Sequence, residues 1–144
     1  MSNNSKQLSN PASTGGLGVH FENRVQTSFV VLMITDGFAP CLPTWPIKKI
    51  KFQGRYLNYE TDDLIVYAKH PTDGRESKLL GQIKHSINIT NSNKEFANVL
   101  QAAWNDFNNS KVFTEGEDVI ALITGPLSEI DTIHVRALLI QAKE

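Results

Sequence analysis

The stretch "TDDLIVYAKHPTDGRESKLLGQIKHSINIT" (residues 61–90) decides the fold. Its β-branched run at residues 64–68 and its second apolar run at residues 79–89 are both typical of β-strands. The segment "PTDGRE" between them contains proline, aspartate and glycine, which favour a turn. The two runs are therefore predicted to pair as an antiparallel hairpin.

Upstream of this hairpin, the pattern first predicts one more strand and then a helix. Ile47, Ile50 and Phe52 are the apolar residues of the strand. The helix is predicted at about residues 19–35, stopping near Gly37. Its apolar face consists of Phe21, Val25, Phe29 and Leu32, widened by Val30, Val31, Met33 and Ile34.

Downstream of the hairpin, "KEFANVLQAAWNDFNN" has the spacing of an amphipathic helix, with Ser92 or Asn93 as N-cap and Glu95 in the first turn. Trp104 and Phe107 are expected in the core. The run "DVIALITG" predicts a buried strand. The last segment, "PLSEIDTIHVRALLIQAKE", predicts a helix that reaches the last residue without a stop signal.

The predicted order is helix, three strands, helix, strand, helix. This order indicates an α/β domain with a mixed sheet, in which an antiparallel meander is followed by a crossover to a further strand. Residues 1–17 are rich in Ser, Asn and Gly and are expected to form a disordered tail. Residues 18–144 are expected to form one domain that was excised from a longer protein.

Composition narrows the class of protein. The chain has 144 residues, of which 40% are apolar, enough for one core. A single cysteine, Cys41, allows no internal disulfide and favours a reducing compartment. The first sixteen residues are polar, and no apolar run approaches the roughly 18 residues of a membrane span. We therefore expect a cytoplasmic protein with no membrane partner.

Charge is unevenly distributed along the chain. The net charge of −1 argues against nucleic-acid binding when it is considered alone. However, residues 46–94 contain nine Lys or Arg against five Asp or Glu, whereas residues 95–144 contain three against eight. A positive middle section can meet phosphates even in a slightly acidic chain.

Polar side chains near the ends of the hairpin strands form a candidate site. Residues alternate faces along a strand, so Gln82 and Lys84 share one face. If Asp63 lies on the matching face of the neighbouring strand, a carboxylate, an amide and an ammonium group converge at one edge of the sheet. Asp62, being consecutive with Asp63, is then expected to point away from the site.

Such a trio suits metal-assisted hydrolysis. Carboxylate and amide oxygens are ligands for Mg²⁺, a hard cation. Lys84 would orient or deprotonate the attacking water, or stabilise charge on a phosphate. Glu22, at the edge of the apolar stripe of the first helix, is placed to complete the acidic side. Gly81 is expected to let a nucleic-acid backbone approach closely.

Four segments, in their order along the chain, resemble the PD-(D/E)xK nuclease superfamily. They are "GVHFENRV", "TDDLIVY", "GQIKHS" and the helix "SNKEFANVLQAAWNDF". The sequence is most similar to the Mrr-like branch, in which Gln replaces the second acidic residue to give QxK. It also resembles the N-terminal double-stranded DNA endonuclease domains of bacterial anti-phage effectors, both in CBASS systems and fused to STAND-type NTPases in AVAST systems. The resemblance covers roughly residues 15–125.

The resemblance implies a restriction-endonuclease-like mixed sheet flanked by helices. It implies that Asp63 is the metal-binding acid, Gln82 and Lys84 the QxK pair, and Glu22 the first-helix acid. The implied cofactor is Mg²⁺ or Mn²⁺, held by Asp63, Gln82 and Glu22. The implied activity is cleavage of double-stranded DNA with little sequence specificity, as the effector part of an anti-phage system. The implied partners are C-terminal NTPase or sensor domains and, in the active state, further copies of the chain.

Each of these residues also has an ordinary structural interpretation. Asp62 and Asp63 are typical of a turn before a strand, Lys84 is typical of an edge strand, and Glu22 is typical of a helix's first turn. A catalytically silent nuclease fold that binds DNA or mediates assembly is therefore the second hypothesis. Only the joint order of the four candidate residues favours an active nuclease.

Overall fold

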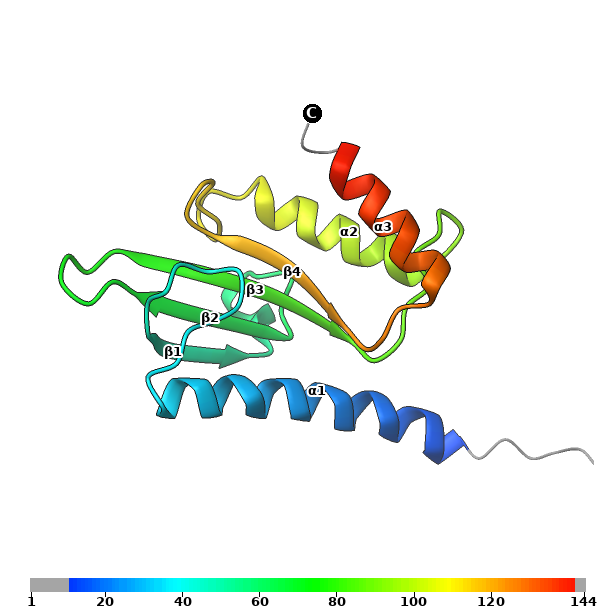
Figure 1. The fold of residues 1–144 in the computed structure, drawn as a ribbon, viewed down its shortest axis with the longest axis horizontal. Helices are drawn as coiled ribbons and strands as arrows, with labels where there is room; N and C mark the ends of the chain where they lie inside the picture. Colours follow the sequence, from blue (N-terminus) through cyan, green and yellow to red (C-terminus); the bar gives the residue numbers. More distant parts are fainter. Residues whose placement is uncertain (1–10, 142–144) are drawn as a thin grey trace, which may run out of the picture.

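The computed structural model describes residues 11–141 of the chain. They form a four-stranded mixed sheet between two helices (Figure 1). The predicted α/β class and the predicted order of helices and strands are confirmed. The elements are α1 (Pro11–Ile34), β1 (Ile47–Phe52), the 3₁₀ helix η1 (Gly54–Leu57), β2 (Leu64–Lys69), β3 (Glu76–Lys84), α2 (Lys94–Phe107), β4 (Val119–Thr124) and α3 (Glu129–Gln141).

The strand order is β1-β2-β3-β4. The first three strands form an antiparallel meander, and the predicted β2–β3 hairpin is confirmed, with Leu64 opposite Gly81 and Lys69 opposite Glu76. β4 pairs with β3 in parallel. Parallel neighbours cannot be joined by a tight turn, so the chain crosses over through α2 before it returns as β4.

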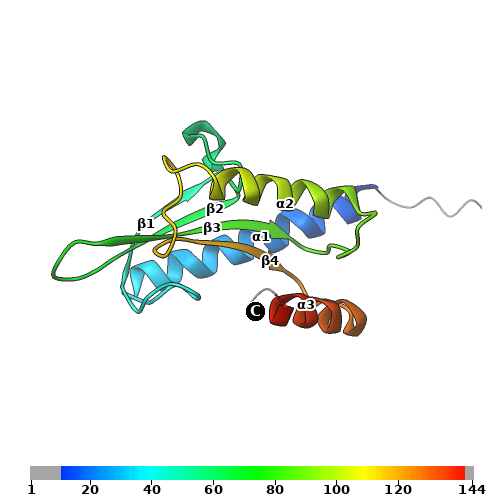
Figure 2. The same cartoon turned by 90° about the horizontal axis from the view of Figure 1, so that it is seen from above.

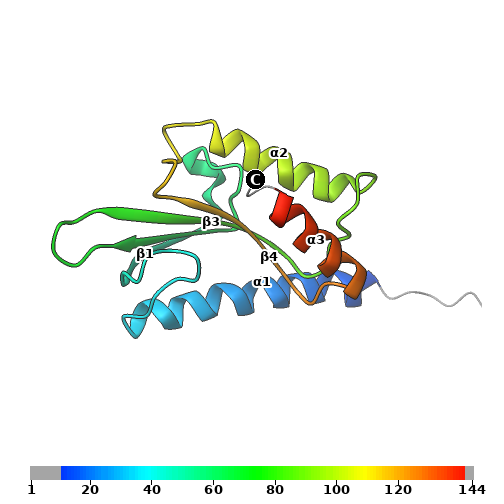
Figure 3. The same ribbon diagram turned by 45° about the horizontal axis from the view of Figure 1, so that its top comes forward.

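Two apolar layers lie on the two faces of the sheet. Figures 1 and 3 show α1 on one side of the strands and α2 on the other. Alternating strand residues supply both layers. The α1 layer contains Phe29, Ala39, Ile47, Leu64, Val66, Leu79 and Ile83. The layer on the other face contains Tyr59, Ile65, Tyr67, Leu80, Val112 and Phe113.

Helix α1 is longer than predicted. It begins at Pro11, so residues 11–17 of the expected tail are helical, while residues 1–10 lie outside the described residues. Its end agrees with the predicted stop, where the backbone N–H of Gly37 donates to the carbonyl of Leu32 at 2.6 Å. Val31 and Ile34, which were expected to widen the apolar face, are exposed, because they lie on the side of the helix away from Phe29.

Strands β3 and β4 also differ from prediction. β3 ends at Lys84 and does not continue to Ile89. β4 is only half-buried along its whole length, not fully buried as predicted, because it forms an edge of the sheet. Helix α3 lies on the β4 side of the sheet (Figure 2), and none of its residues is buried.

Helix α2 starts as predicted, since the Asn93 side chain accepts the N–H of Phe96 at 2.9 Å and so caps the helix. Its orientation differs from prediction. Trp104 and Phe107, expected in the core, are 62% and 42% exposed. Asp106 is buried instead, because its carboxylate takes hydrogen bonds from the loop that precedes β2. A buried carboxylate needs such partners, and satisfying it sets the rotation of the helix.

Candidate active site

Asp63 lies where the loop after η1 becomes strand β2. Its carboxylate oxygen Oδ2 accepts the backbone N–H of Ile83 at 2.7 Å and also a hydrogen bond from the Gln82 side-chain amide. β2 begins at Leu64, which pairs with Gly81. The Asp63 side chain therefore continues the bonding between β2 and β3 beyond the end of the strand.

Gln82 and Lys84 face α2, on the side of the sheet opposite to Ile83. Both line a hollow of about 430 Å³ together with α2 residues Glu95 and Asn98, whereas Ile83 belongs to the α1 layer. The spacing of two residues thus places the amide and the ammonium group on the same face, as strand geometry requires.

Glu22 comes to this region from α1, on the other side of the sheet. Gln26, one helical turn later, donates from Nε2 both to Glu22 Oε1 at 2.9 Å and to the carbonyl of Asp63 at 3.2 Å. Gln26 therefore joins the helix to the start of β2 and fixes the position of Glu22 relative to Asp63. Sequence reasoning did not single out Gln26, although its i+4 relation to Glu22 was visible.

The four candidate residues line one hollow of about 570 Å³ at the edge of the sheet. Glu22, Asp63, Gln82 and Lys84 share it with Gln53, Arg55, Tyr56 and Asp62. The expectation that Asp62 points away from the site is wrong. Both aspartates precede the first residue of β2, so strand alternation does not govern them. The expectation for Gly81 is also wrong, because a side chain there would meet Ile123 and Leu64 inside the sheet.

The acidic groups in this hollow affect one another. Burial raises the pKa of the Glu22 carboxyl above its usual value, and the nearby Asp63 charge raises it further, against the opposing effects of Gln26 and Lys84. Burial followed by the Asp63 charge also raises the pKa of Asp62, which Arg55 partly offsets. The site therefore concentrates negative charge that a cation would relieve.

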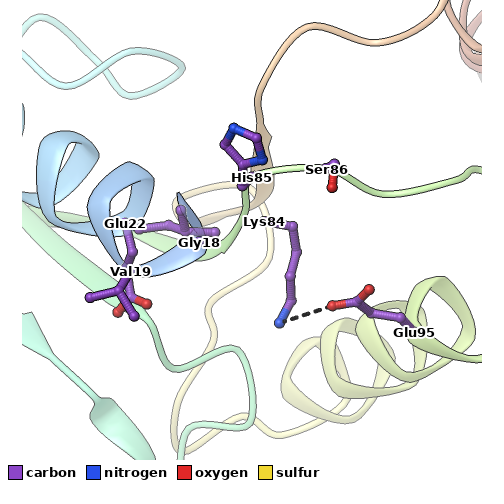
Figure 4. Close-up of a pocket in the computed structure, with 8 residues that line it drawn as sticks. Gly18, Val19, Glu22, Lys84, His85, Ser86 and Glu95 are labelled. Atoms are coloured by element: carbon purple, nitrogen blue, oxygen red, sulfur yellow. Dashed lines mark ion pairs between the residues drawn. The ribbon is translucent and has the colours of Figure 1, made fainter. Parts of the chain in front are cut away.

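Lys84 does not contact Asp63 directly. Its Nζ lies 3.5 Å from Oε1 of Glu95 in the first turn of α2, as Figure 4 shows. Lys84 and Glu95 also line a hollow of about 430 Å³ with Glu22, on the side where His85 and Ser86 leave the sheet. The ammonium group thus stands between the acidic hollow and α2.

The loop that carries the aspartates is anchored to α2 by Asp106, which sequence reasoning missed. The Asp106 carboxylate, only 1% exposed, accepts the N–H of Glu60 at 3.0 Å and the N–H of Thr61 at 2.7 Å. In addition, Asn105 donates to the Glu60 side chain at 2.8 Å. The amphipathic pattern of this helix does not mark Asp106 as buried, because Asp106 follows the polar Asn105, and its burial depends on the loop that it bonds.

The donor set is compatible with one hard divalent cation. Within residues 11–141, no three His, Cys, Asp or Glu side chains gather closely enough to form a metal cage. Mg²⁺ does not require such a cage, because it commonly binds through one or two carboxylates and keeps several waters or substrate oxygens. Asp63 and Glu22 supply two carboxylates in one hollow, and their mutual repulsion favours a cation between them.

A comparison with protein-family models, with curated proteins and with solved structures finds no match for this chain. The resemblance described above therefore remains a prediction from the sequence. Among the described residues, no helix combines the length and the apolar character needed to cross a membrane.

Proposed function

We propose that this chain hydrolyses phosphodiester bonds in DNA with the help of a divalent metal ion. The observation that carries this proposal is the joint hollow of Glu22, Asp63, Gln82 and Lys84, supplied by α1, the start of β2, and β3. Two carboxylates, an amide and an ammonium group around one solvent-filled space suit the binding of a phosphate and a cation together.

Asp63 and Glu22 are the residues that would hold the metal. Mg²⁺ or Mn²⁺ bound there would polarise the phosphate and favour ionisation of a nearby water. The role of Gln82 in this proposal differs from the role of metal ligand that the resemblance implies. Its amide N–H group holds the Asp63 carboxylate, so Gln82 positions the first ligand, and only its oxygen is available for a cation.

Lys84 stabilises negative charge on the phosphate in this proposal. Its ammonium group is half-buried at the rim of the acidic hollow, where a fixed cation near a phosphate acts more strongly than in water. The pair with Glu95 keeps the lysine side chain extended away from the sheet (Figure 4). A phosphate that enters the hollow would compete with Glu95 for it.

The restriction-endonuclease-like fold is part of the same proposal. The mixed sheet β1-β2-β3-β4, with α1 and α2 on opposite faces, is compatible with it. The role in anti-phage defence, the C-terminal NTPase or sensor domains, the assembly of several copies and the cytoplasmic location are supported by the sequence resemblance and composition alone. Double-stranded DNA is the proposed substrate.

A catalytically silent fold that binds DNA is the second candidate function. It is favoured because two of the candidate residues already make structural contacts. Asp63 bonds to the end of β3, and Lys84 is paired with Glu95. In this case the hollow would hold a phosphate without hydrolysing it.

The test is cleavage of a supercoiled plasmid by the full chain with Mg²⁺ and with EDTA. The proposal expects nicking or linearisation that requires Mg²⁺ and is lost in Asp63→Asn. Asp73→Asn is the matched control, because Asp73 is an exposed aspartate in the β2–β3 turn, away from the hollow. Undiminished cleavage by Asp63→Asn would exclude this site, and DNA binding without cleavage would favour the silent fold.

A further inference from the structure

A strongly exposed aromatic side chain lies at the rim of the candidate site. Tyr56 is 94% exposed, more than any other large hydrophobic residue described for this chain. It lines the hollow that contains Asp63 and Lys84. Tyrosine is enriched at interfaces, because its ring is apolar and its hydroxyl is polar.

The backbone that presents Tyr56 is tightly fixed. Tyr56 lies in η1, and the residues that flank this short helix, Gln53 and Asn58, have left-handed backbone angles, with φ of 51° and 67°. Such angles are uncommon outside glycine and persist where the surroundings impose them. Gly54 is buried at the start of η1, where a Cβ atom would collide with the Ile65 side chain.

The same turn is tied directly to the acidic loop. The N–H of Gly54 donates to the carbonyl of Asp62 at 2.7 Å. This bond joins the backbone of η1 to the residue next to Asp63. A backbone that is ordered before the ligand arrives lowers the entropy cost of binding.

One basic residue stands beside the ring in the hollow, and two more lie on strand β1. Arg55, exposed and adjacent to Tyr56, lines the same hollow. On β1, Lys49 and Lys51 lie over the Tyr67 ring, with Nζ 3.9 Å and 5.5 Å from its centroid. Tyr67 belongs to the layer on the α2 side, so both lysines flank the face that holds Gln82 and Lys84. Within the hollow, Arg55 and Tyr56 combine a cation with an aromatic ring, the combination that binds single strands of nucleic acid.

We infer that Tyr56 stacks on an unpaired nucleobase while Arg55 contacts the neighbouring phosphate, so that η1 holds one strand of the substrate next to Asp63. This inference rests on the proposed function and adds a substrate subsite to it. The base must be unpaired, since only an unstacked base offers its face to a ring. In the proposed double-stranded substrate one base is accordingly turned outward, and a single-stranded oligonucleotide offers the same unpaired base in a binding test.

Tyr56 is suited to a clean test, because so exposed a side chain contributes little to folding. The measurement is fluorescence anisotropy in EDTA, which excludes cleavage. The full chain is titrated against a labelled single-stranded oligonucleotide and against an abasic strand of equal length. The abasic strand keeps the phosphates and lacks the bases, so it isolates the stacking contribution.

Tyr56→Ala is expected to weaken binding of the base-containing strand by about 5- to 150-fold, the range that loss of one stacked base produces. Tyr56→Phe keeps the ring and is expected to bind like the wild type. On the abasic strand the wild type and Tyr56→Ala are expected to bind equally. Trp104→Ala removes another exposed aromatic ring, which does not line this hollow, and is the control for a general loss of aromatic surface.

A Tyr56→Trp variant gives a second, direct readout. The chain has two tryptophans, so the difference from the wild type reports the added one. Stacking on a base is expected to quench this added fluorescence with the oligonucleotide and not with the abasic strand. Equal binding of both strands by wild type and Tyr56→Ala, with no quenching in Tyr56→Trp, would overturn the inference while leaving Mg²⁺-dependent plasmid cleavage intact. Absence of both binding and cleavage would instead reject the proposed function together with the subsite.

Discussion

The two ends of strand β3 are built from the same parts and have different chemistry. At each end an aspartate stands directly before a neighbouring strand and accepts a backbone N–H from β3. Asp63 precedes β2 and accepts from Ile83 at 2.7 Å, and Asp118 precedes β4 and accepts from Lys78 at 2.8 Å. Each end also has a lysine on β3, either Lys84 or Lys78.

The difference lies in what remains available for a ligand. Asp118 uses both oxygens, because Oδ2 accepts the N–H of Thr114 at 2.8 Å and pairs with Lys78 Nζ at 3.1 Å. Its side chain is only 2% exposed. Asp63 uses Oδ2 alone within residues 11–141, and Lys84 turns to Glu95 instead of pairing with it. The same strand-end arrangement is therefore closed at one end, while at the other end it leaves an oxygen and a cation beside a hollow.

The largest expected effect separates the two lysines. Lys84→Ala should lower Mg²⁺-dependent plasmid cleavage by about 10²–10³-fold, the usual loss when a group that stabilises transition-state charge is removed. Lys78→Ala should leave the cleavage rate per folded molecule unchanged, because Lys78 lies at the closed end. The measurement is the initial cleavage rate of each purified variant, normalised to its folded fraction by circular dichroism. Equal losses in both variants would mean that the two ends do not differ in function.

The next effect is on stability, and here the larger loss is expected at the Asp118 end of β3. Asp118→Ala should lower the free energy of unfolding by about 3 kcal/mol, because it leaves Lys78 partly buried without its partner and two N–H groups without an acceptor. Asp63→Asn should cost less, since an amide oxygen can still accept the Ile83 N–H. Urea unfolding followed by far-UV circular dichroism gives both values. A greater loss in Asp63→Asn would show that Asp63 is the main structural aspartate.

The sequence alone does not distinguish these two ends. "TDDLIVY" and "GEDVIAL" both place acids before an apolar run, and only the order of motifs favoured the first. Periodicity and turn residues predicted the meander, the crossover and the helix order, because burial of alternating residues determines them. Periodicity also placed Gln82 and Lys84 on a common face, since that depends on strand geometry alone.

The parts that could not be predicted depend on contacts between distant segments. The rotation of α2 follows from Asp106, which bonds to a loop 45 residues earlier in the chain. The position of Asp62 in the hollow follows from the turn around η1, whose left-handed residues are Gln53 and Asn58 and not glycines. Neither the buried acid nor these backbone angles leave a periodic signal in the sequence.

A smaller effect concerns the cation that the open end is proposed to hold. Mg²⁺ should raise the free energy of unfolding of the wild type by about 1–3 kcal/mol at concentrations well above its dissociation constant, because it binds the folded state. Asp118→Ala should keep this increment, while Asp63→Asn should lose most of it. Thermal unfolding with and without Mg²⁺ measures the increment independently of cleavage.

A matched control separates site binding from a general salt effect. The monovalent salt concentration is adjusted so that ionic strength stays constant in all samples. An equal Mg²⁺ increment in Asp63→Asn would show that the cation binds elsewhere, and the two ends of β3 would then not differ in metal affinity.

The smallest expected effect sharpens the role of Lys84. Its pair with Glu95 is long, at 3.5 Å, and partly exposed, with side chains 30% and 54% exposed, so it contributes little to stability. In the proposed function Glu95 competes with the phosphate for Lys84. Glu95→Gln should therefore leave the unfolding free energy nearly unchanged and raise the cleavage rate by about two- to fivefold at low salt, which corresponds to the loss of a competing pair worth up to about 1 kcal/mol.

Salt dependence identifies the cause of this change. Added salt screens the Lys84–Glu95 attraction, so the advantage of Glu95→Gln over wild type should shrink as ionic strength rises. Glu115→Gln, another exposed glutamate that does not line the site, removes one negative charge without touching Lys84 and should match the wild type at every salt concentration. Single-turnover cleavage rates across a salt series test both statements. A cleavage rate of Glu95→Gln as low as that of Lys84→Ala would contradict competition. Glu95 would then hold Lys84 in its working position. The open end of β3 would in that case depend on α2 as closely as the other end depends on Asp118.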